Sequence, residues 1–242
     1  MLLILWEVSV VVFAVPKYML PSPIAVFQAL YNYAPMLAYH TGVTLFETVL
    51  AFVLCLVVGM PLAVAIASIR WIEKSIYPWL VVSQAVPKVA IAPLLLVWLG
   101  FGMETKIVVA VLVAFFPIVI SMVVGLKSLP NEMRDLGRSM GLSSMDMFRK
   151  IRLPYALPAT FGGIKVAATF AVVGAVIGEF VGADRGLGYL LLYSAGQLQT
   201  DIMFADVFIL GVMGVALFGA VEWAERKLLP WHISIRNELV GT

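Results

Sequence analysis

Six long apolar segments constrain what this chain can fold into. They cover residues 2–18, 43–69, 76–99, 107–126, 163–181 and 203–228. A helix of about 20 apolar residues crosses the ~30 Å hydrocarbon core of a bilayer, and each of the last five segments has about that length or more. Backbone groups in hydrocarbon must be satisfied internally, and the alternating pattern of barrel strands is absent. We therefore predict an all-α membrane protein with about six transmembrane helices.

The composition supports a bilayer environment. Hydrophobic residues make up 62% of the 242 positions and charged residues 12%, whereas soluble domains average about 45–50% apolar and about 25% charged residues. The net charge of +2 is too small to indicate nucleic acid binding. Cys55 has no second cysteine to pair with, and no histidine cluster accompanies it, so we expect neither an intrachain disulfide nor a metal site.

The N-terminal region divides into a first helix over residues 1–20 and an outer loop over residues 21–41. The first segment is short for a span, so we expect either that its helix ends near Tyr18 or that the true start lies upstream. Ser22 and Pro23 are typical of a helix N-terminus, which predicts a short interfacial helix in this loop, although an ordinary loop is the alternative. Residues 42–242 are predicted to form a core of five transmembrane helices.

Basic residues predict the orientation of these spans. With the N-terminus inside, the cytoplasmic segments are residues 70–75, residues 127–162 and the C-terminal tail. Their basic residues are Arg70, Lys74, Lys127, Arg134, Arg138, Arg149, Lys150, Arg152, Arg226, Lys227 and Arg236. The opposite side keeps only Lys17, Lys106 and Arg185. This positive-inside bias predicts that both termini are cytoplasmic.

One polar stretch, residues 127–158, interrupts the apolar pattern with the sequence KSLPNEMRDLGRSMGLSSMDMFRKIRLPYALP. Residues 131–140 favour a helix, and Gly141 can adopt the left-handed conformation that terminates it. Ser143 and Asp146 match a capping box that starts a second short helix, which we expect Leu153-Pro154 to end. Apolar side chains among basic ones on this corner are suited to insertion into a groove of a partner protein. A solvated loop whose charges only set the topology is the alternative.

This stretch resembles the EAA loop in the membrane subunits of binding-protein-dependent ABC importers. The family pattern is E-A-A-x-x-x-G, nine residues, then I-x-L-P. Here residues 135–137 read Asp-Leu-Gly, Gly141 follows after three residues, and residues 151–154 read Ile-Arg-Leu-Pro after nine more. Asp for Glu and Leu-Gly for Ala-Ala depart from the pattern, and a glycine weakens a helix by about 1 kcal/mol relative to alanine. The resemblance assigns a role in coupling to the ATPase to Asp135, Gly137, Met140, Gly141, Leu142, Ser143, Met145, Ile151, Leu153 and Pro154.

The resemblance covers nearly the whole chain. LPSPIAVFQAL, APLLLVWLGFGMETK, FFPIVI and GLGYLLL are similar to permeases of the nitrate, sulfonate and taurine type. VPKVAIAPLLLVWLGFG and IGEFVGADRGLGYLLL look closer to the branch for thiamine-pyrimidine or riboflavin precursors. The family implies a type I importer permease fold, a permease homodimer, two copies of an ABC ATPase subunit, and an extracytoplasmic solute-binding protein. It also implies that ATP-Mg binds the partner, which agrees with the absence of a G-x-x-x-x-G-K-[ST] phosphate loop here.

Several intramembrane residues are candidates for lining a path. Lys88 falls near the middle of the third segment between Pro87 and Pro93, where a cation costs at least about 2.5–3.5 kcal/mol. We expect it to line or gate the path, and a snorkelling or interhelical pairing role is the alternative. Glu179 lies beside glycines spaced four apart, a pattern that permits close packing against another helix, and a second permease copy is one candidate for it. These glycines are Gly174, Gly178 and Gly182.

The role of Glu179 stays open among contact with substrate, binding protein or Lys88 and no special role. Glu47 is a weaker candidate of the same kind, and Asp201 and Asp206 are expected to be solvated. A passive channel or scaffold is the alternative class of function. An intramembrane protease is disfavoured, because no serine–histidine pair or aspartate pair falls within the spans.

Overall fold

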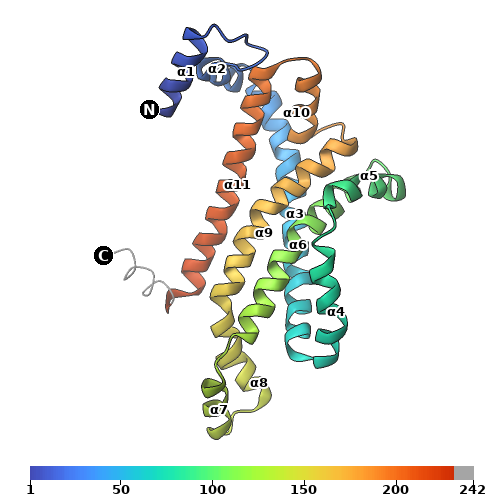
Figure 1. The fold of residues 1–242 in the computed structure, drawn as a ribbon, viewed down its shortest axis with the longest axis vertical. Coiled ribbons are helices and arrows are strands. Elements are labelled where there is room, and N and C mark those ends of the chain that lie inside the picture. The colour runs from blue at the N-terminus through green and yellow to red at the C-terminus, as the bar shows by residue number, and fades with distance from the viewer. Residues whose placement is uncertain (232–242) are drawn as a thin grey trace. The chain divides into compact units, whose positions relative to one another are not determined.

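The computed structural model describes residues 1–231, and Arg236 and the rest of the C-terminal tail lie outside these residues. The described chain is almost wholly helical (Figure 1). Its first half contains α1 (Leu2–Val12), α2 (Pro23–Asn32), α3 (Ala34–Ser68), α4 (Arg70–Ser83), α5 (Lys88–Leu99) and α6 (Met103–Lys127). Its second half contains α7 (Asn131–Ser139), α8 (Ser144–Met147), the π-helical η1 (Phe148–Arg152), α9 (Leu153–Gly182), α10 (Leu187–Gly196) and α11 (Thr200–Leu228).

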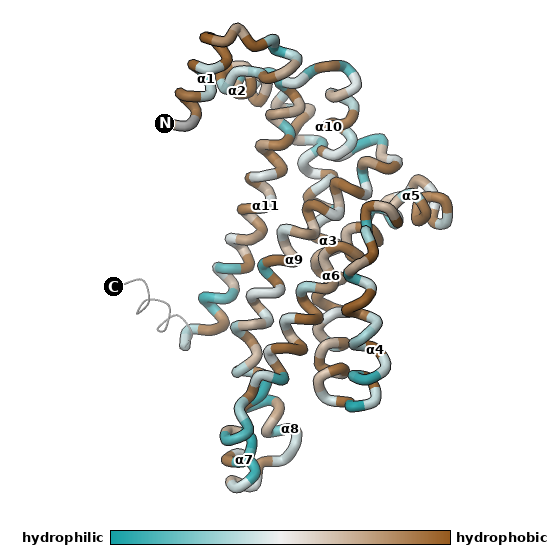
Figure 2. The backbone as a smooth tube through the Cα atoms, in the orientation of Figure 1, coloured by the Kyte–Doolittle hydropathy of each residue, from teal (hydrophilic) through white to brown (hydrophobic). Residues whose placement is uncertain are grey.

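Four stretches are long and apolar enough to cross a membrane. They are Ala34–Ser68, Met103–Lys127, Ser144–Gly182 and Thr200–Leu228. The bent pair of α4 and α5 adds a fifth if the two helices form one span. Along α6, α9 and α11 the residues are predominantly hydrophobic, whereas hydrophilic residues gather on α7 (Figure 2). The multi-pass, all-α membrane class predicted from the sequence is therefore confirmed.

Two of the six predicted segments differ from the prediction. The first forms only α1, an 11-residue helix that ends at Val12 and not near Tyr18. The third is broken into α4 and α5, which are bent by 100°. Pro87 directly precedes α5 and explains the break, because proline donates no backbone hydrogen bond and disfavours helical geometry in the residue before it.

The N-terminus of α2 agrees with the sequence. Ser22 is the N-cap, its side-chain oxygen accepts a hydrogen bond of 3.3 Å from the backbone N–H of Ala25, and Pro23 opens the helix. The helix is therefore present, and its position at the outer interface stays a prediction.

The chain divides into two compact units. One contains residues 1–50, 89–110 and 172–215, and the other contains residues 51–88, 111–171 and the described residues from 216 on. The long helices α3, α6, α9 and α11 contribute residues to both units. The core of the first unit includes Val26, Ala29, Leu37, Leu190, Ile202 and Ala205. The second unit has two apolar clusters, centred on small and aliphatic residues of α3, α6 and α9.

Candidate functional site

A glycine corner joins α7 to α8 in the loop of residues 127–162, called the coupling loop below. Gly141 has a φ of +74°, the left-handed conformation expected from the sequence. Its N–H donates to the carbonyl of Arg138 at 3.0 Å, and the N–H of Leu142 donates to the carbonyl of Gly137 at 3.1 Å. These two bonds form a Schellman motif, which satisfies the last carbonyls of α7 and reverses the chain. The predicted corner at Gly141 is confirmed.

Ser143 starts the second helix of the coupling loop, as predicted. Its hydroxyl oxygen accepts a 3.1 Å bond from the backbone N–H of Asp146 and donates to the Asp146 carboxylate at 2.7 Å. The predicted end of this helix at Leu153-Pro154 is wrong, because α8 continues through η1 into α9. The N–H of Leu153 bonds to the carbonyl of Phe148, five residues earlier. This wider turn accommodates Pro154, whose ring would clash with a carbonyl in a regular helix.

The coupling loop is packed on one side and exposes apolar side chains on the other. Gly137 is buried, and a methyl group there would collide with the end of the Met147 side chain. In this chain the glycine that weakens α7 therefore also lets α7 approach α8. Met140 and Met145 are 70% and 57% exposed. They present an apolar surface that nothing in the described chain covers.

Arg152 attaches the coupling loop to the ends of two long helices. Its Nη2 donates to the carbonyl of Ala67 on α3 at 3.3 Å and to that of Leu126 on α6 at 3.4 Å. Arg152 occupies the variable position of the I-x-L-P pattern. It donates hydrogen bonds to carbonyls of the last turns of these helices, and carbonyls at such positions have no donor within their own helix. Sequence reasoning counted Arg152 only as a topology charge.

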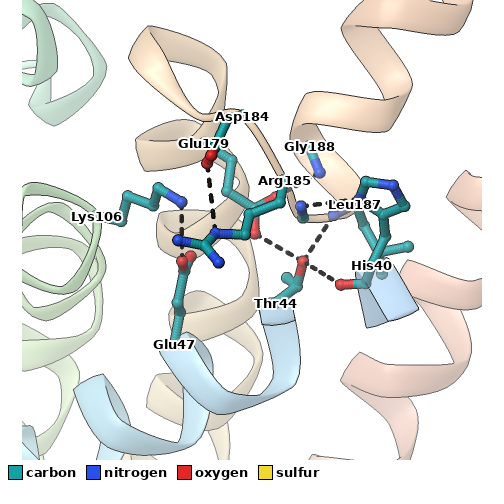
Figure 3. Close-up of polar contacts among 10 residues, drawn as sticks. His40, Thr44, Glu47, Lys106, Glu179, Asp184, Arg185, Leu187 and Gly188 are labelled. Atoms are coloured by element: carbon teal, nitrogen blue, oxygen red, sulfur yellow. Dashed lines mark hydrogen bonds and ion pairs between the residues drawn. The ribbon is translucent and has the colours of Figure 1, made fainter. Parts of the chain in front are cut away.

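A second group of polar side chains lies in the first unit and is called the polar cluster below (Figure 3). It contains the buried Thr44, Glu47, Lys106 and Glu179 and the half-buried His40. Lys106 on α6 donates to Glu47 on α3 at 3.0 Å, and both side chains are almost fully buried. Lys106 is therefore buried within α6 and not exposed beside the span, and its place on the outer side stays a prediction. A buried cation and carboxylate this close form a paired site in which each compensates the other's charge.

Glu179 fixes the turn between α9 and α10. It accepts a hydrogen bond of 2.7 Å from the Thr44 hydroxyl and another from the backbone N–H of Gly188. The Thr44 oxygen accepts in turn from the N–H of Leu187 at 2.7 Å, as Figure 3 shows. His40 Nδ1 accepts from the N–H of Gly186 at 3.0 Å. Three successive backbone N–H groups are thus held by side chains of α3 and α9.

The charges around this turn are unevenly distributed. Arg185 lies in the turn itself, where a hydrogen bond with Tyr39 and the carboxylate of Asp184 raise the pKa of its guanidinium above the ordinary value. Glu179 and Glu47 lie close enough for their carboxyl groups to share a hydrogen bond. The Lys106 ammonium, which is itself buried, neutralises the Glu47 carboxylate beside them.

The predicted glycine face packs against helices of the same chain. Gly178 lies against the backbone of Lys106, with 2.8 Å between its virtual Cβ and Cα of that lysine. Gly182 lies against the side chains of Phe101 and Leu96, and Gly174 is also buried. The close approach that glycines permit is therefore used between α9 and the region of α5 and α6.

Lys88 lies at the start of α5, after the break, and not in the middle of a continuous span. Its ammonium donates to the Gln84 carbonyl at 3.0 Å and lies 4.9 Å from the centroid of the Phe116 ring. Within residues 1–231 the structure gives it no carboxylate partner, and the suggested contact with Glu179 stays a prediction. Pro87 and Pro93 flank it as predicted, and its place in a path stays a prediction.

Asp206 on α11 also differs from expectation. It is fully buried, and neither carboxylate oxygen has a hydrogen-bond partner within residues 1–231. Asp201 is half-buried, and its carboxylate accepts from the N–H of Ile202 at 2.9 Å. The expectation that both are solvated is wrong for Asp206.

Comparison with known proteins identifies the family of this chain. The family described as "Binding-protein-dependent transport system inner membrane component" matches residues 56–230, which include the whole coupling loop. This chain belongs to that family. It is a transmembrane permease subunit of an ABC importer, and the alternatives of a passive channel and a scaffold are set aside.

Individual relatives cover almost the whole permease. A probable ABC transporter permease protein of Haemophilus influenzae is 38% identical over 96% of this chain and 94% of its own. The riboflavin transport system permease protein RibX of Chloroflexus aurantiacus is 36% identical over 97% and 88%. The formylaminopyrimidine transport permease protein ThiX of Halalkalibacterium halodurans is 34% identical over 96% and 93%.

A solved structure shares the fold. A chain of the MetNI methionine ABC transporter, in an inward-facing form, matches with a TM-score of 0.64 and 20% identity over 86% of this chain and 98% of its own. The predicted type I importer permease fold is confirmed.

The polar cluster was missed at the sequence level although Glu47 and Glu179 were noted singly. Lys106 pairs with a residue 59 positions away, and Thr44 with one 135 positions away. One sequence signal could have indicated the cluster: Glu47, Lys106 and Glu179 all fall within or beside apolar segments, where an unpaired charge is costly.

Proposed function

We propose that two copies of this permease form the translocation path of a binding-protein-dependent importer in the cell membrane, with both termini cytoplasmic. Two ABC ATPase subunits bind the two coupling loops and carry the ATP-Mg, while this chain hydrolyses nothing. An extracytoplasmic solute-binding protein delivers the solute to the outer face.

One observation carries the ATPase assignment. The coupling loop has a rigid glycine corner whose inner face is packed through Gly137 and Met147, while Met140 and Met145 protrude. Exposed apolar side chains on a water-facing loop are costly unless a partner covers them, and a few such anchors supply most of the binding energy at protein interfaces. The other predicted coupling residues, including Asp135, Ile151 and Leu153, support this surface or flank it.

The proposed solute is small and polar, and two classes are open. The first is anionic, of the nitrate, sulfonate or taurine kind, and the relative named for taurine transport in Escherichia coli is 26% identical. The second is a thiamine-pyrimidine or riboflavin-type precursor, and the relatives named for such solutes are 34% and 36% identical. This higher identity favours the second class. Identifying the ligand of the binding protein that stimulates ATP hydrolysis in the reconstituted complex would decide between them.

The docking proposal is tested by placing a charge on the apolar surface. In Met140→Glu and Met145→Glu, a carboxylate would have to be desolvated in the partner's groove, so we expect loss of ATPase co-purification. Gly141→Asp should have the same effect by distorting the corner. Met140→Leu and Met145→Leu keep the apolar surface and are expected to retain the ATPase.

Unchanged insertion and thermal midpoint in the glutamate variants would show that the permease itself still folds. Normal co-purification of the ATPase with both variants would contradict the docking assignment.

A further inference from the structure

A cavity of about 430 Å³ lies under the coupling loop. Its wall includes Ala67, next to the end of α3, and Lys127, the last residue of α6. Three arginines line it as well, namely Arg134, Arg138 and Arg152. Four cations therefore face one cavity at the level where two long apolar helices end.

These cations are only partly neutralised. Lys127 pairs with Glu73, and Arg138 pairs loosely with Asp135 at 3.6 Å across a largely exposed contact. Arg134 and Arg152 have no carboxylate partner within the described part of the chain. The Nε atom of Arg152 is moreover buried without any hydrogen-bond acceptor there.

Such a cluster of cations is stabilised by a negative charge at its centre. Like charges around a partly enclosed cavity repel one another, and a buried guanidinium nitrogen without an acceptor loses its hydration without compensation. Guanidinium groups present planar, forked donors that match the oxygens of phosphate, and Ser144 adds a hydroxyl to the same wall. The chemistry of the wall is thus complementary to an oxyanion.

We propose that this cavity is a binding site for a phosphate group, either the headgroup of an anionic phospholipid or a soluble phosphate compound. Its position at the ends of α3 and α6 suits a headgroup. Leu142 is the one predicted coupling residue in the wall, and the exposed Met140 and Met145 do not line the cavity. The site is therefore argued from its own cations and does not rest on the proposed function. A bound anion would hold α7 against the helix ends through Arg134.

The test uses the full-length permease in nanodiscs of pure phosphatidylcholine, titrated with inorganic pyrophosphate while the thermal midpoint is followed. A parallel arm measures the midpoint in nanodiscs that also contain phosphatidylglycerol, and the lipids retained on the protein are analysed by mass spectrometry. Arg134→Gln removes an unpaired cation of the wall. Arg149→Gln is the matched control, because Arg149 is an exposed arginine of the same loop that does not line the cavity.

We expect saturable stabilisation by at least one probe, weakened at least tenfold in Arg134→Gln and unchanged in Arg149→Gln. Stabilisation by phosphatidylglycerol alone would identify a headgroup site, and stabilisation by pyrophosphate alone a site for a soluble phosphate compound. Either result supports the proposal.

Equal effects on all three proteins would overturn it, because the response would then be nonspecific. Absence of a saturable response would overturn it as well. ATPase co-purification is measured for the same variants. If Arg134→Gln kept the response to both probes and lost only ATPase co-purification, the cavity would be part of the docking surface and the proposal would again fail.

Discussion

The buried pair of Glu47 and Lys106 makes a quantitative prediction. Glu47 is 0% exposed and Lys106 6% exposed, with 3.0 Å between the ammonium nitrogen and the nearer carboxylate oxygen. Removing one partner of such a pair leaves an uncompensated buried charge and costs about 3–5 kcal/mol. Lys106→Met should fall within this range, because it leaves the fully buried Glu47 carboxylate without its cation.

The double variant Glu47→Met/Lys106→Met separates the charge from the packing. Replacing both members of a buried pair by apolar residues of similar volume is often close to neutral. We therefore expect the double variant to be more stable than Lys106→Met by about 3 kcal/mol, a strongly non-additive result.

The free energy of unfolding is measured by titrating the full chain with a denaturing detergent in mixed micelles and following its circular dichroism. Lys150→Met serves as a control, because it breaks an exposed pair with Asp146 and should cost under about 1 kcal/mol. If the destabilisations of the two single variants simply added in the double variant, the two side chains would not interact and the polar cluster would be misassigned.

Two further predictions concern helix packing and orientation. Gly162→Ala and Gly163→Ala each gain about 1 kcal/mol of helix propensity. A methyl group at Gly163 would lie 2.5 Å from the Pro117 carbonyl oxygen, whereas a methyl group at Gly162 would have no atom within 4 Å. Overpacking costs about 1–3 kcal/mol, so Gly163→Ala should be less stable than Gly162→Ala in the same detergent titration, and equal stability would refute this close contact. Met140→Cys should react with a membrane-impermeant maleimide only in inside-out vesicles, with Cys55 as a silent background because it is buried. Labelling in right-side-out vesicles would reverse the proposed topology.

Features set by neighbouring residues were predictable from the sequence. The corner at Gly141 and the caps at Ser22 and Ser143 each depend on residues within three or four positions, where backbone sterics and local hydrogen bonds decide the conformation. The apolar segments were also predictable, because their length reports directly on the thickness of the bilayer.

The polar cluster was not predictable because it depends on tertiary packing. The hydropathy pattern placed Lys106 outside a span, because a single lysine beside an apolar segment usually marks the end of a transmembrane helix. In the structure α3 supplies a carboxylate at the matching position, and this pairing allows the lysine to be buried. The bend at Pro87 was missed for a related reason, since an average over a window is insensitive to one missing backbone donor.

The continuity of α8, η1 and α9 has a mechanical consequence. The sequence predicted that Pro154 ends the second helix, and in that case a flexible turn would join the surface around Met145 to α9. A displacement of that surface would then not be transmitted to α9. The π-helical segment instead carries the helix through the proline without a break. Arg152, on the same segment, ties it to α3 and α6. A displacement of the coupling loop is therefore expected to move the adjoining ends of α3, α6 and α9 together, which is the behaviour that the proposed coupling to a partner ATPase requires.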